Sequence, residues 1–295
     1  MAKLNNRTSH DSSFGNDSRP EGPLVIDLQS ILRKRIPKKI NRWIPSFLIS
    51  GVAKLIRQDE LNEILRVTYP SRGWKFSKAV LNHLGISVEV RGFDELPDNS
   101  RFMFASNHPL GGLDGIALIG VLGEKYGDEG IGFLVNDMLM NVEPLKDVFL
   151  PVNKFGSQGR DATQAINAAI ASDRQILQFP AGLCSRKNKG GEIKDLEWQK
   201  SFVAKSIEYH RDIVPVYFQG RNSSLFYNTA SWRKKLGLKF NVEQTLLPSE
   251  LCKAKNSRFK ITFGTPIPWQ SLKESGKTAK QLATEIREAA YALQD

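Results

Sequence analysis

From Arg101 to the end of the chain, short apolar runs alternate with amphipathic stretches, and this alternation constrains the fold more than any other feature. A strand-like run at 101–106 is followed by a helical pattern at 114–125, and the same exchange recurs downstream. The patterns predict further strands at 86–90, 130–136, 147–153, 175–180, 212–218 and 259–264. They predict further helices at 58–88, 160–173, 198–210 and 277–293. Strands that alternate with helices predict an α/β domain with a mainly parallel sheet flanked by helices.

Residues 107–115, Asn-His-Pro-Leu-Gly-Gly-Leu-Asp-Gly, lie between the first strand and the first helix of this series. Ligands of parallel sheets bind where strands end, and His108 falls at that point. A histidine at a strand end and an aspartate at a helix start can face each other across a glycine-rich turn. Asp114 would then orient the imidazole of His108 as a general base. The alternative, which is the commoner one for an isolated pair, is an aspartate that only caps the helix.

A second strand-end loop follows 175–180. It begins Phe179-Pro180-Ala181-Gly182 and continues with several basic residues and glycines, Arg186 among them. Cations at a strand end suit an anionic headgroup, while a solvated basic loop is the simpler alternative.

The chain of 295 residues carries a formal net charge of +11, which favours an anionic partner such as nucleic acid, acidic lipid or acidic protein. Eight of its basic residues and no acidic residue lie between Ile31 and Arg57, where apolar residues recur at every fourth position. Pro37 and Pro45 break this pattern into short helices. A basic amphipathic segment is typical of an anionic membrane surface. Packing of the same stripe on the catalytic domain is the alternative.

A nucleic-acid-binding protein is the rival that charge alone suggests. The charge lies in an amphipathic stretch and is not interleaved with exposed aromatic residues on strands, which argues against nucleic-acid binding.

We expect a disordered tail at 1–22, the basic amphipathic helical segment at 23–84 and the α/β domain at 85–295. Two cysteines make no disulfide framework, the histidines show no metal-ligand spacing, and neither a signal peptide nor a membrane-spanning run is evident. A reducing cytoplasm fits this composition.

Asn107, His108 and Asp114 together resemble the NHxxxxD block of the PlsC-like glycerolipid acyltransferase superfamily. Five residues separate His108 from Asp114, where the family usually has four, and the extra residue falls in the Gly111–Gly112 turn. Phe179-Pro180-Ala181-Gly182 resembles the FPAG form of the family's FPEG block, as found in the haemolysin-like bacterial branch. Weaker matches lie at 149–154, 213–216 and 263–267, so the resemblance covers about residues 85 to 270.

The resemblance implies an acyltransferase domain at 85–295 that moves a fatty acyl group from an acyl carrier protein or coenzyme A thioester to a lysolipid hydroxyl, without a further cofactor. It would act peripherally at the cytoplasmic face of the inner membrane. His108 would be the base and Asp114 its partner, and Cys184 is expected to pack and not to act as a nucleophile. The expected substrate-binding residues are Asn107, Gly111, Gly112, Asn153, Lys154, Phe179, Pro180, Gly182 and Arg186.

The expected acceptor rests on two differences from the family's usual motifs. Ala181 replaces the family's Glu, and no Arg stands clearly after Val152. These features resemble the aminolipid O-acyltransferase type, so the expected acceptor is an N-acyl amino acid, a lyso-glycine or lyso-ornithine lipid. Lys154 and Arg186 would contact its carboxylate. The alternatives are 1-acyl-glycerol 3-phosphate, which would yield phosphatidic acid, and a catalytically silent lipid-binding protein on the same fold.

Overall fold

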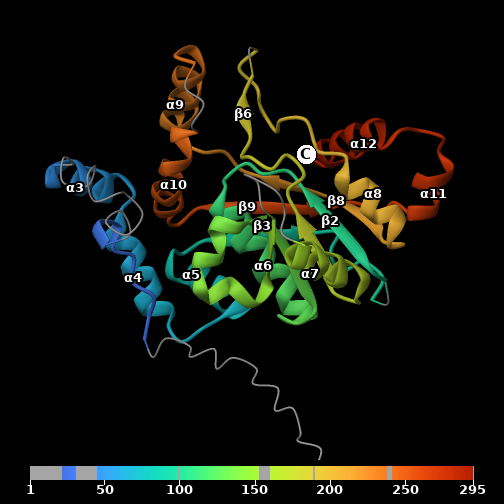
Figure 1. Cartoon of the computed structure of the whole chain (residues 1–295), viewed down its shortest axis with the longest axis horizontal. Coiled ribbons are helices and arrows are strands. Elements are labelled where there is room, and N and C mark those ends of the chain that lie inside the picture. Colours follow the sequence, from blue (N-terminus) through green and yellow to red (C-terminus); the bar gives the residue numbers. More distant parts are fainter. Residues whose placement is uncertain are drawn as a thin grey trace, which may run out of the picture.

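A computed structural model describes residues 22–30, 45–98, 100–152, 160–188, 190–237 and 241–294. Its centre is a seven-stranded sheet in the order β1-β9-β8-β2-β5-β3-β4. Helices surround this sheet (Figure 1). All neighbouring strands are parallel except β8 and β9, so the expected mainly parallel α/β sheet is confirmed. The strands are β1 (Ser87–Arg91), β2 (Phe102–Ser106), β3 (Ile131–Asn136), β4 (Phe149–Val152), β5 (Gln175–Gln178), β8 (Asp212–Gln219) and β9 (Arg258–Phe263).

Helices flank the sheet, and a separate two-stranded antiparallel hairpin pairs β6 (Arg186–Lys187) with β7 (Ile193–Lys194). The described helices are α3 (Ser46–Leu55), α4 (Gln58–Thr68), α5 (Gly73–His83), α6 (Gly112–Tyr126), α7 (Arg160–Ala171), α8 (Ser201–Glu208), α9 (Ser224–Lys235), α10 (Leu247–Lys253), α11 (Trp269–Glu274) and α12 (Ala279–Tyr291). Short 3-10 turns lie at η1 (Asp137–Asn141), η2 (Glu143–Val148) and η3 (Val242–Leu246).

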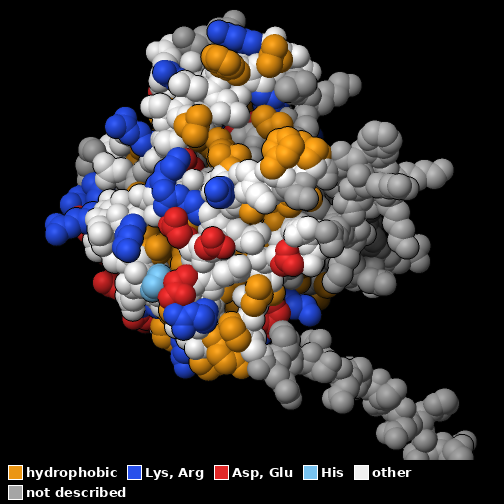
Figure 2. Space-filling model, turned by 90° about the vertical axis from the view of Figure 1, so that its left-hand side faces the viewer, with side chains coloured by type: hydrophobic (Ala, Val, Ile, Leu, Met, Phe, Trp, Pro, Cys, Tyr) orange, Lys and Arg blue, Asp and Glu red, His pale blue; other side chains and the backbone are white. Residues whose placement is uncertain are grey.

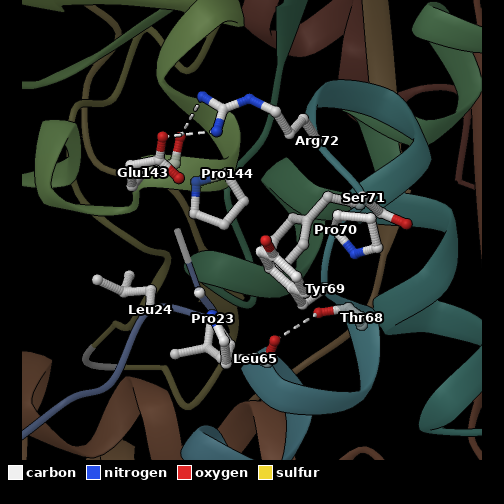
Figure 3. A pocket seen from close by; sticks show the side chains of 12 residues that line it. Pro23, Leu24, Leu65, Thr68, Tyr69, Pro70, Ser71, Arg72, Glu143 and Pro144 are labelled. Carbon is white, nitrogen blue, oxygen red and sulfur yellow. Dashed lines mark hydrogen bonds and ion pairs between the residues drawn. The ribbon is translucent and has the colours of Figure 1, made fainter. Parts of the chain in front are cut away.

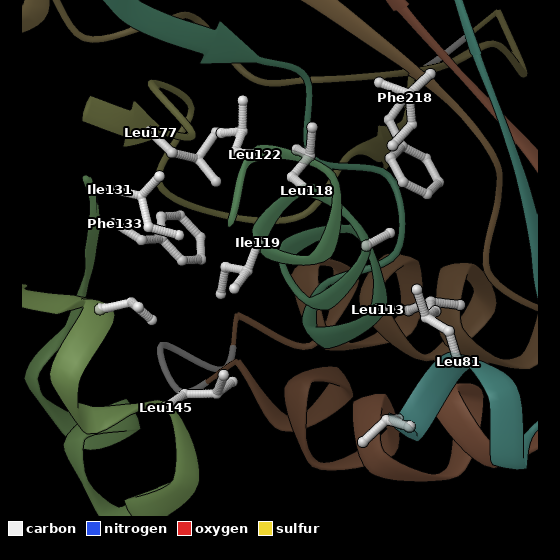
Figure 4. Close-up of a cluster of buried hydrophobic side chains, with 14 of the residues drawn as sticks. Leu81, Leu113, Leu118, Ile119, Leu122, Ile131, Phe133, Leu145, Leu177 and Phe218 are labelled. Atoms are coloured by element: carbon white, nitrogen blue, oxygen red, sulfur yellow. The ribbon is translucent and has the colours of Figure 1, made fainter. Parts of the chain in front are cut away.

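The alternation of side chains along β2 divides the core into two layers. Phe102 and Phe104 belong to the cluster that includes residues of α4, α5 and α6, part of which Figure 4 shows. Met103 and Ala105 belong to the cluster that includes residues of α7, α8 and α12. All four side chains are fully buried, as expected of a strand covered on both faces. The site therefore rests on a strand that packing holds from both sides.

Several elements differ from the sequence-based expectation. The helix expected at 58–88 is two helices, α4 and α5, because Pro70 lies between them and lacks a backbone N–H. The strand expected at 147–153 begins only at Phe149, after η2. Helices α9 to α11 and the β6–β7 hairpin were not predicted. In α9 the large hydrophobic residues Leu225 and Trp232 are exposed, so the helix shows no clean apolar stripe.

The described N-terminal residues pack against α4 and α5. The Asn62 side chain accepts the Ile26 N–H at 2.7 Å and donates to the Ile26 carbonyl at 3.0 Å. A cavity of about 40 Å³ lies between this segment and the turn after α4, next to the Arg72–Glu143 ion pair (Figure 3). Helices α4 and α5 share a core with the sheet, and the division expected at residue 85 stays a prediction. The tail at 1–21 and residues 31–44 of the basic stripe lie outside the described residues.

Candidate active site

His108 lies just beyond the carboxyl end of β2, between the neighbouring parallel strands β5 and β8. The residue before it fixes the start of this loop. The Asn107 side chain donates to the Phe218 carbonyl at 3.0 Å and accepts the Phe218 N–H at 2.6 Å. Asn107, expected to bind substrate, is thus buried with both ends of its amide engaged by β8. Its role in this geometry is to hold the His108 loop to the sheet.

The Asp114 carboxylate faces His108 across the turn. Its Oδ2 lies 3.1 Å from His108 Nδ1 and also accepts the N–H groups of Leu110 at 2.8 Å and Gly111 at 3.2 Å. The carboxylate is fully buried at the first turn of α6, where anions are stabilised by the helix. The sequence left open whether Asp114 orients His108 or only caps the helix. In the structure the same oxygen does both, since it faces the imidazole and accepts the N–H groups at the helix start.

Gly111 accommodates the additional residue of the turn. Its φ of +82° lies in a region that side-chain-bearing residues rarely adopt. A Cβ at Gly111 would also lie 2.8 Å from a methyl of Leu247 and 3.2 Å from the Cys184 sulfur. At Gly112 a Cβ would meet no heavy atom within 4 Å, so this residue borders open space. The turn is thereby closed on the Gly111 side and open on the Gly112 side.

Phe179 forms a wall of the site. Its ring stacks on the His108 imidazole with centroids 4.0 Å apart and an interplanar angle of 17°. A turn closes behind it, since the Gly182 N–H donates to the Phe179 carbonyl at 2.9 Å. Ala181 is buried in an apolar cluster with Trp198 and Phe202. A glutamate at this position would enter a largely apolar layer, where an unpaired charge is costly.

A second buried carboxylate, Asp195, supports the loop and was not anticipated from the sequence. Its Oδ1 accepts the backbone N–H of His108 at 3.2 Å and the Ser185 hydroxyl at 2.6 Å, and its Oδ2 accepts Trp198 Nε1–H at 2.9 Å. The Ser185 N–H donates in turn to the His108 carbonyl at 2.8 Å. Burial raises the pKa of Asp195, although these hydrogen bonds oppose the shift. No local motif marks the residue, because its partners come from three segments.

Arg186 does not stand free for a substrate. Its guanidinium pairs with fully buried Glu243 at 2.8 Å and donates to the Cys184 carbonyl at 2.8 Å. Arg233 of α9 pairs with the other oxygen of Glu243 at 2.9 Å. The three side chains therefore tie α9 and η3 to the β5–β6 loop. Asn153 and Lys154, the other expected contacts, lie outside the described residues.

The electrostatics of His108 follow from its burial and its neighbours. Burial alone lowers the pKa of His108, but the Asp114 carboxylate and Cys184 together raise it well above its ordinary value. The Cys184 side chain is buried and lies within hydrogen-bonding reach of the imidazole. No spacing pattern predicts this contact, since 76 positions separate the two residues. The geometry supplies a histidine whose protonated form is stabilised when it accepts a proton.

A cavity of about 510 Å³ opens next to Phe179, Pro180 and Gly182. Polar and hydrophobic residues both line it, but its exposed wall is mainly apolar, with contributions from Leu134, Val152, Ile166 and Phe202. The cavity suits an apolar ligand beside Phe179, the residue whose ring stacks on His108. Within the described ranges no group of three or more His, Cys, Asp or Glu side chains is placed to hold a metal ion. No helix there has both the length and the apolar character that crossing a membrane requires.

Comparison with known proteins identifies relatives of this chain. Residues 30–295 match the model of a family described as Acyltransferase. The chain is 46% identical over 269 residues to the lyso-glycine lipid O-acyltransferase of Phocaeicola vulgatus, covering 91% of this chain and 95% of the relative. It is 45% identical to the enzyme of the same name from Bacteroides thetaiotaomicron, covering 91% and 97%. The crystal structure of PlsC, the 1-acyl-sn-glycerophosphate acyltransferase of Thermotoga maritima, matches with 14% identity and a TM-score of 0.44 over 84% of this chain and 91% of that one.

Proposed function

Because this chain belongs to the acyltransferase family, we propose that it transfers a fatty acyl group from a thioester to the hydroxyl of an N-acyl amino acid, with a glycine lipid as the acceptor. The observation that carries the proposal is the His108–Asp114 pair at the end of β2, at 3.1 Å. The relatives named as lyso-glycine lipid O-acyltransferases support this choice of acceptor.

The chemistry follows from the orientation of the imidazole. Nδ1 faces Asp114, which leaves Nε2 to take the proton of the acceptor hydroxyl. The hydroxyl oxygen attacks the thioester carbonyl and forms the new ester bond as the carbon–sulfur bond breaks. The departing thiolate then takes the proton from the imidazolium, so the histidine returns to its neutral form. Asp114 stabilises the transient imidazolium, and no covalent enzyme intermediate is needed.

Two features of the walls support this reaction. The apolar cavity beside Phe179 offers space for an acyl chain next to the histidine. Ala181, buried among apolar side chains, provides no carboxylate of the kind that the FPEG block has. The second feature favours an amino-acid acceptor over 1-acyl-glycerol 3-phosphate.

The exposed surface supports a peripheral position on a membrane. Helix α3, at the end of the basic stripe, exposes Phe47, Leu48, Val52 and Leu55. Trp232 of α9 and Leu236, which follows the helix, are exposed next to basic residues of its last turn. The face of the molecule that carries these helices shows hydrophobic side chains with Lys and Arg among them, and a group of Asp and Glu near its middle (Figure 2). Apolar side chains flanked by cations are suited to an anionic lipid surface.

The test is a direct acyl-transfer assay. Purified protein is offered a labelled acyl thioester with either a hydroxylated N-acylglycine or 1-acyl-glycerol 3-phosphate, and products are identified by mass spectrometry. We expect higher kcat/KM for the N-acylglycine, and loss of transfer in His108→Ala without loss of the folded state. Normal turnover by His108→Ala would show that His108 is not the general base. A clear preference for 1-acyl-glycerol 3-phosphate would show that this lipid, and not an N-acyl amino acid, is the acceptor.

A further inference from the structure

A polar cavity of about 380 Å³ lies between the β6–β7 hairpin and the connection from β8 to α9. Its lining includes Lys187 and Ile193 of the hairpin, and Arg221, Asn222 and Tyr227 of the connection and helix. The hairpin and α9 contact each other and project together beyond the sheet (Figure 1). This cavity is separate from the apolar one beside Phe179, with which it shares no lining residue.

The wall of this polar cavity is bonded to the loop that carries His108. The Asn222 side chain donates from Nδ2 to the carbonyl of Pro109, the residue next to His108, at 3.1 Å. Gly220 packs on the same loop, since a Cβ there would lie 3.0 Å from a methyl of Leu110. Strands β2 and β8 are parallel neighbours, so both connections leave the sheet at the same edge. The wall of the cavity is therefore attached to the loop that carries His108.

Three donors at the cavity have no acceptor among the described residues. Lys187 and Arg221 are exposed and form no ion pair there. The Tyr227 hydroxyl, which is 4% exposed as a residue, accepts the Asn222 N–H at 3.0 Å, and its own proton has no acceptor. Burial raises the pKa of Tyr227 to about 12, so the hydroxyl stays a donor. Glu250, which accepts from Ser223 at the same helix start, is paired with Lys253 at 2.7 Å.

We propose that this cavity binds the carboxylate of the acceptor headgroup, with Lys187, Arg221 and Tyr227 as its donors. The proposal rests on the proposed function. Arg186 was expected to contact the carboxylate but is paired with Glu243, and these three residues take that role instead. Asn222 adds a discriminating group, because its Oδ1 has no hydrogen-bond partner in the described part of the chain. An N-acyl amino acid carries an amide N–H that can donate to this oxygen, whereas a glycerophosphate has none.

The experiment compares Lys187→Met, Arg221→Gln and Tyr227→Phe with the unaltered protein. Lys273→Met on α11 is the matched control, since Lys273 is an exposed lysine outside the cavity lining. We expect each cavity variant to raise KM for the N-acylglycine about tenfold, as for loss of a hydrogen bond to a charged group. The values of kcat and of KM for the thioester should change little in all three variants. Tm should change little in Lys187→Met and Arg221→Gln, and it should fall in Tyr227→Phe because the Asn222 N–H loses its acceptor. The control should match the unaltered protein in every value.

A carboxamide analogue of the acceptor separates a headgroup contact from a general effect. The unaltered protein should prefer the carboxylate over the carboxamide, and the cavity variants should lose that preference. Equal weakening toward both acceptors, or an effect only on 1-acyl-glycerol 3-phosphate, would overturn the proposal. Titration of a short N-acylglycine by calorimetry, with no thioester present, tests the cavity without turnover. If this binding depends on Lys187 and Arg221 while no transfer occurs, the proposed function fails and the cavity assignment stands.

Discussion

Asp195 holds His108 through the backbone: its Oδ1 accepts the His108 N–H at 3.2 Å, whereas Asp114 holds the same residue through its side chain. The two carboxylates thus position different parts of the same residue. Asp114 sets the orientation of the ring, and Asp195 sets the path of the chain that carries it. Each is buried, and each accepts several hydrogen bonds.

Replacing Asp195 should damage both stability and turnover. Asp195→Ala leaves the donors of His108, Ser185 and Trp198 buried without an acceptor, and each such donor costs about 1–3 kcal/mol. We expect Asp195→Asn to keep more stability and to lower kcat more than it raises KM. Urea unfolding and steady-state kinetics measure these effects. Trp198→Phe is the control because it removes one donor and should keep most turnover. Unchanged unfolding of Asp195→Ala would contradict the role given to these bonds.

The pH dependence of turnover should report the His108–Asp114 pair. A base with a raised pKa is neutral only at higher pH, so kcat/KM should rise with pH through the raised pKa of His108. In Asp114→Asn this acidic limb should move to lower pH, because the carboxylate that raises the pKa is gone. The plateau should fall by on the order of 10²–10⁴. A limb that stays in place would show that another group titrates.

The same pair predicts how stability changes with pH. The charged pair stabilises the folded state fully below the unfolded histidine pKa of about 6.5. Since the folded-state pKa of His108 is higher, this stabilisation is lost as pH rises through that folded value. The advantage of the unaltered protein over His108→Gln in unfolding free energy should therefore shrink with rising pH. Denaturant unfolding across pH 5–9 measures it, and a constant difference would contradict the pairing.

Substitution of the two turn glycines should have opposite effects on stability. Gly111→Ala forces a side chain onto φ +82° and against Leu247, and the backbone strain alone is about 1–3 kcal/mol. Gly112→Ala meets open space at the start of α6 and should be neutral or slightly stabilising. Thermal unfolding of both variants provides the comparison. A greater loss in Gly112→Ala than in Gly111→Ala would be inconsistent with this turn.

The basic stripe predicts salt-sensitive binding to membranes. Changing Arg33, Lys34, Arg35, Lys38 and Lys39 to Glu should release the protein from anionic vesicles, at about 1 kcal/mol per basic residue near the surface. Sedimentation with vesicles at two salt concentrations measures the effect, and the attraction should weaken in high salt. Vesicles of neutral lipid serve as the control. Unaltered sedimentation of the variant would indicate that the stripe packs on the protein.

Local patterns in the sequence were enough to predict the mainly parallel sheet and to place His108 and Asp114 across one turn. The continuous apolar run from Phe102 to Ala105 indicates two buried faces, because successive side chains of a strand point to opposite sides. His108 and Asp114 are six positions apart, so a short turn is all that separates them. Both inferences depend on geometry within one strand, turn or helix start, and the order of residues alone determines such geometry.

The remaining parts of the site were decided by the tertiary structure. Asp195 meets His108 across 87 positions, and Arg186 meets Glu243 across 57, with no spacing rule that connects either pair. Arg186 was expected to contact the substrate. It is a structural contact instead, because the buried carboxylate of Glu243 needs a cation as its partner. Lys187, Arg221 and Tyr227 are ordinary residues in sequence. They share a cavity only because β2 and β8 are neighbours in the sheet and their loops leave it at the same edge.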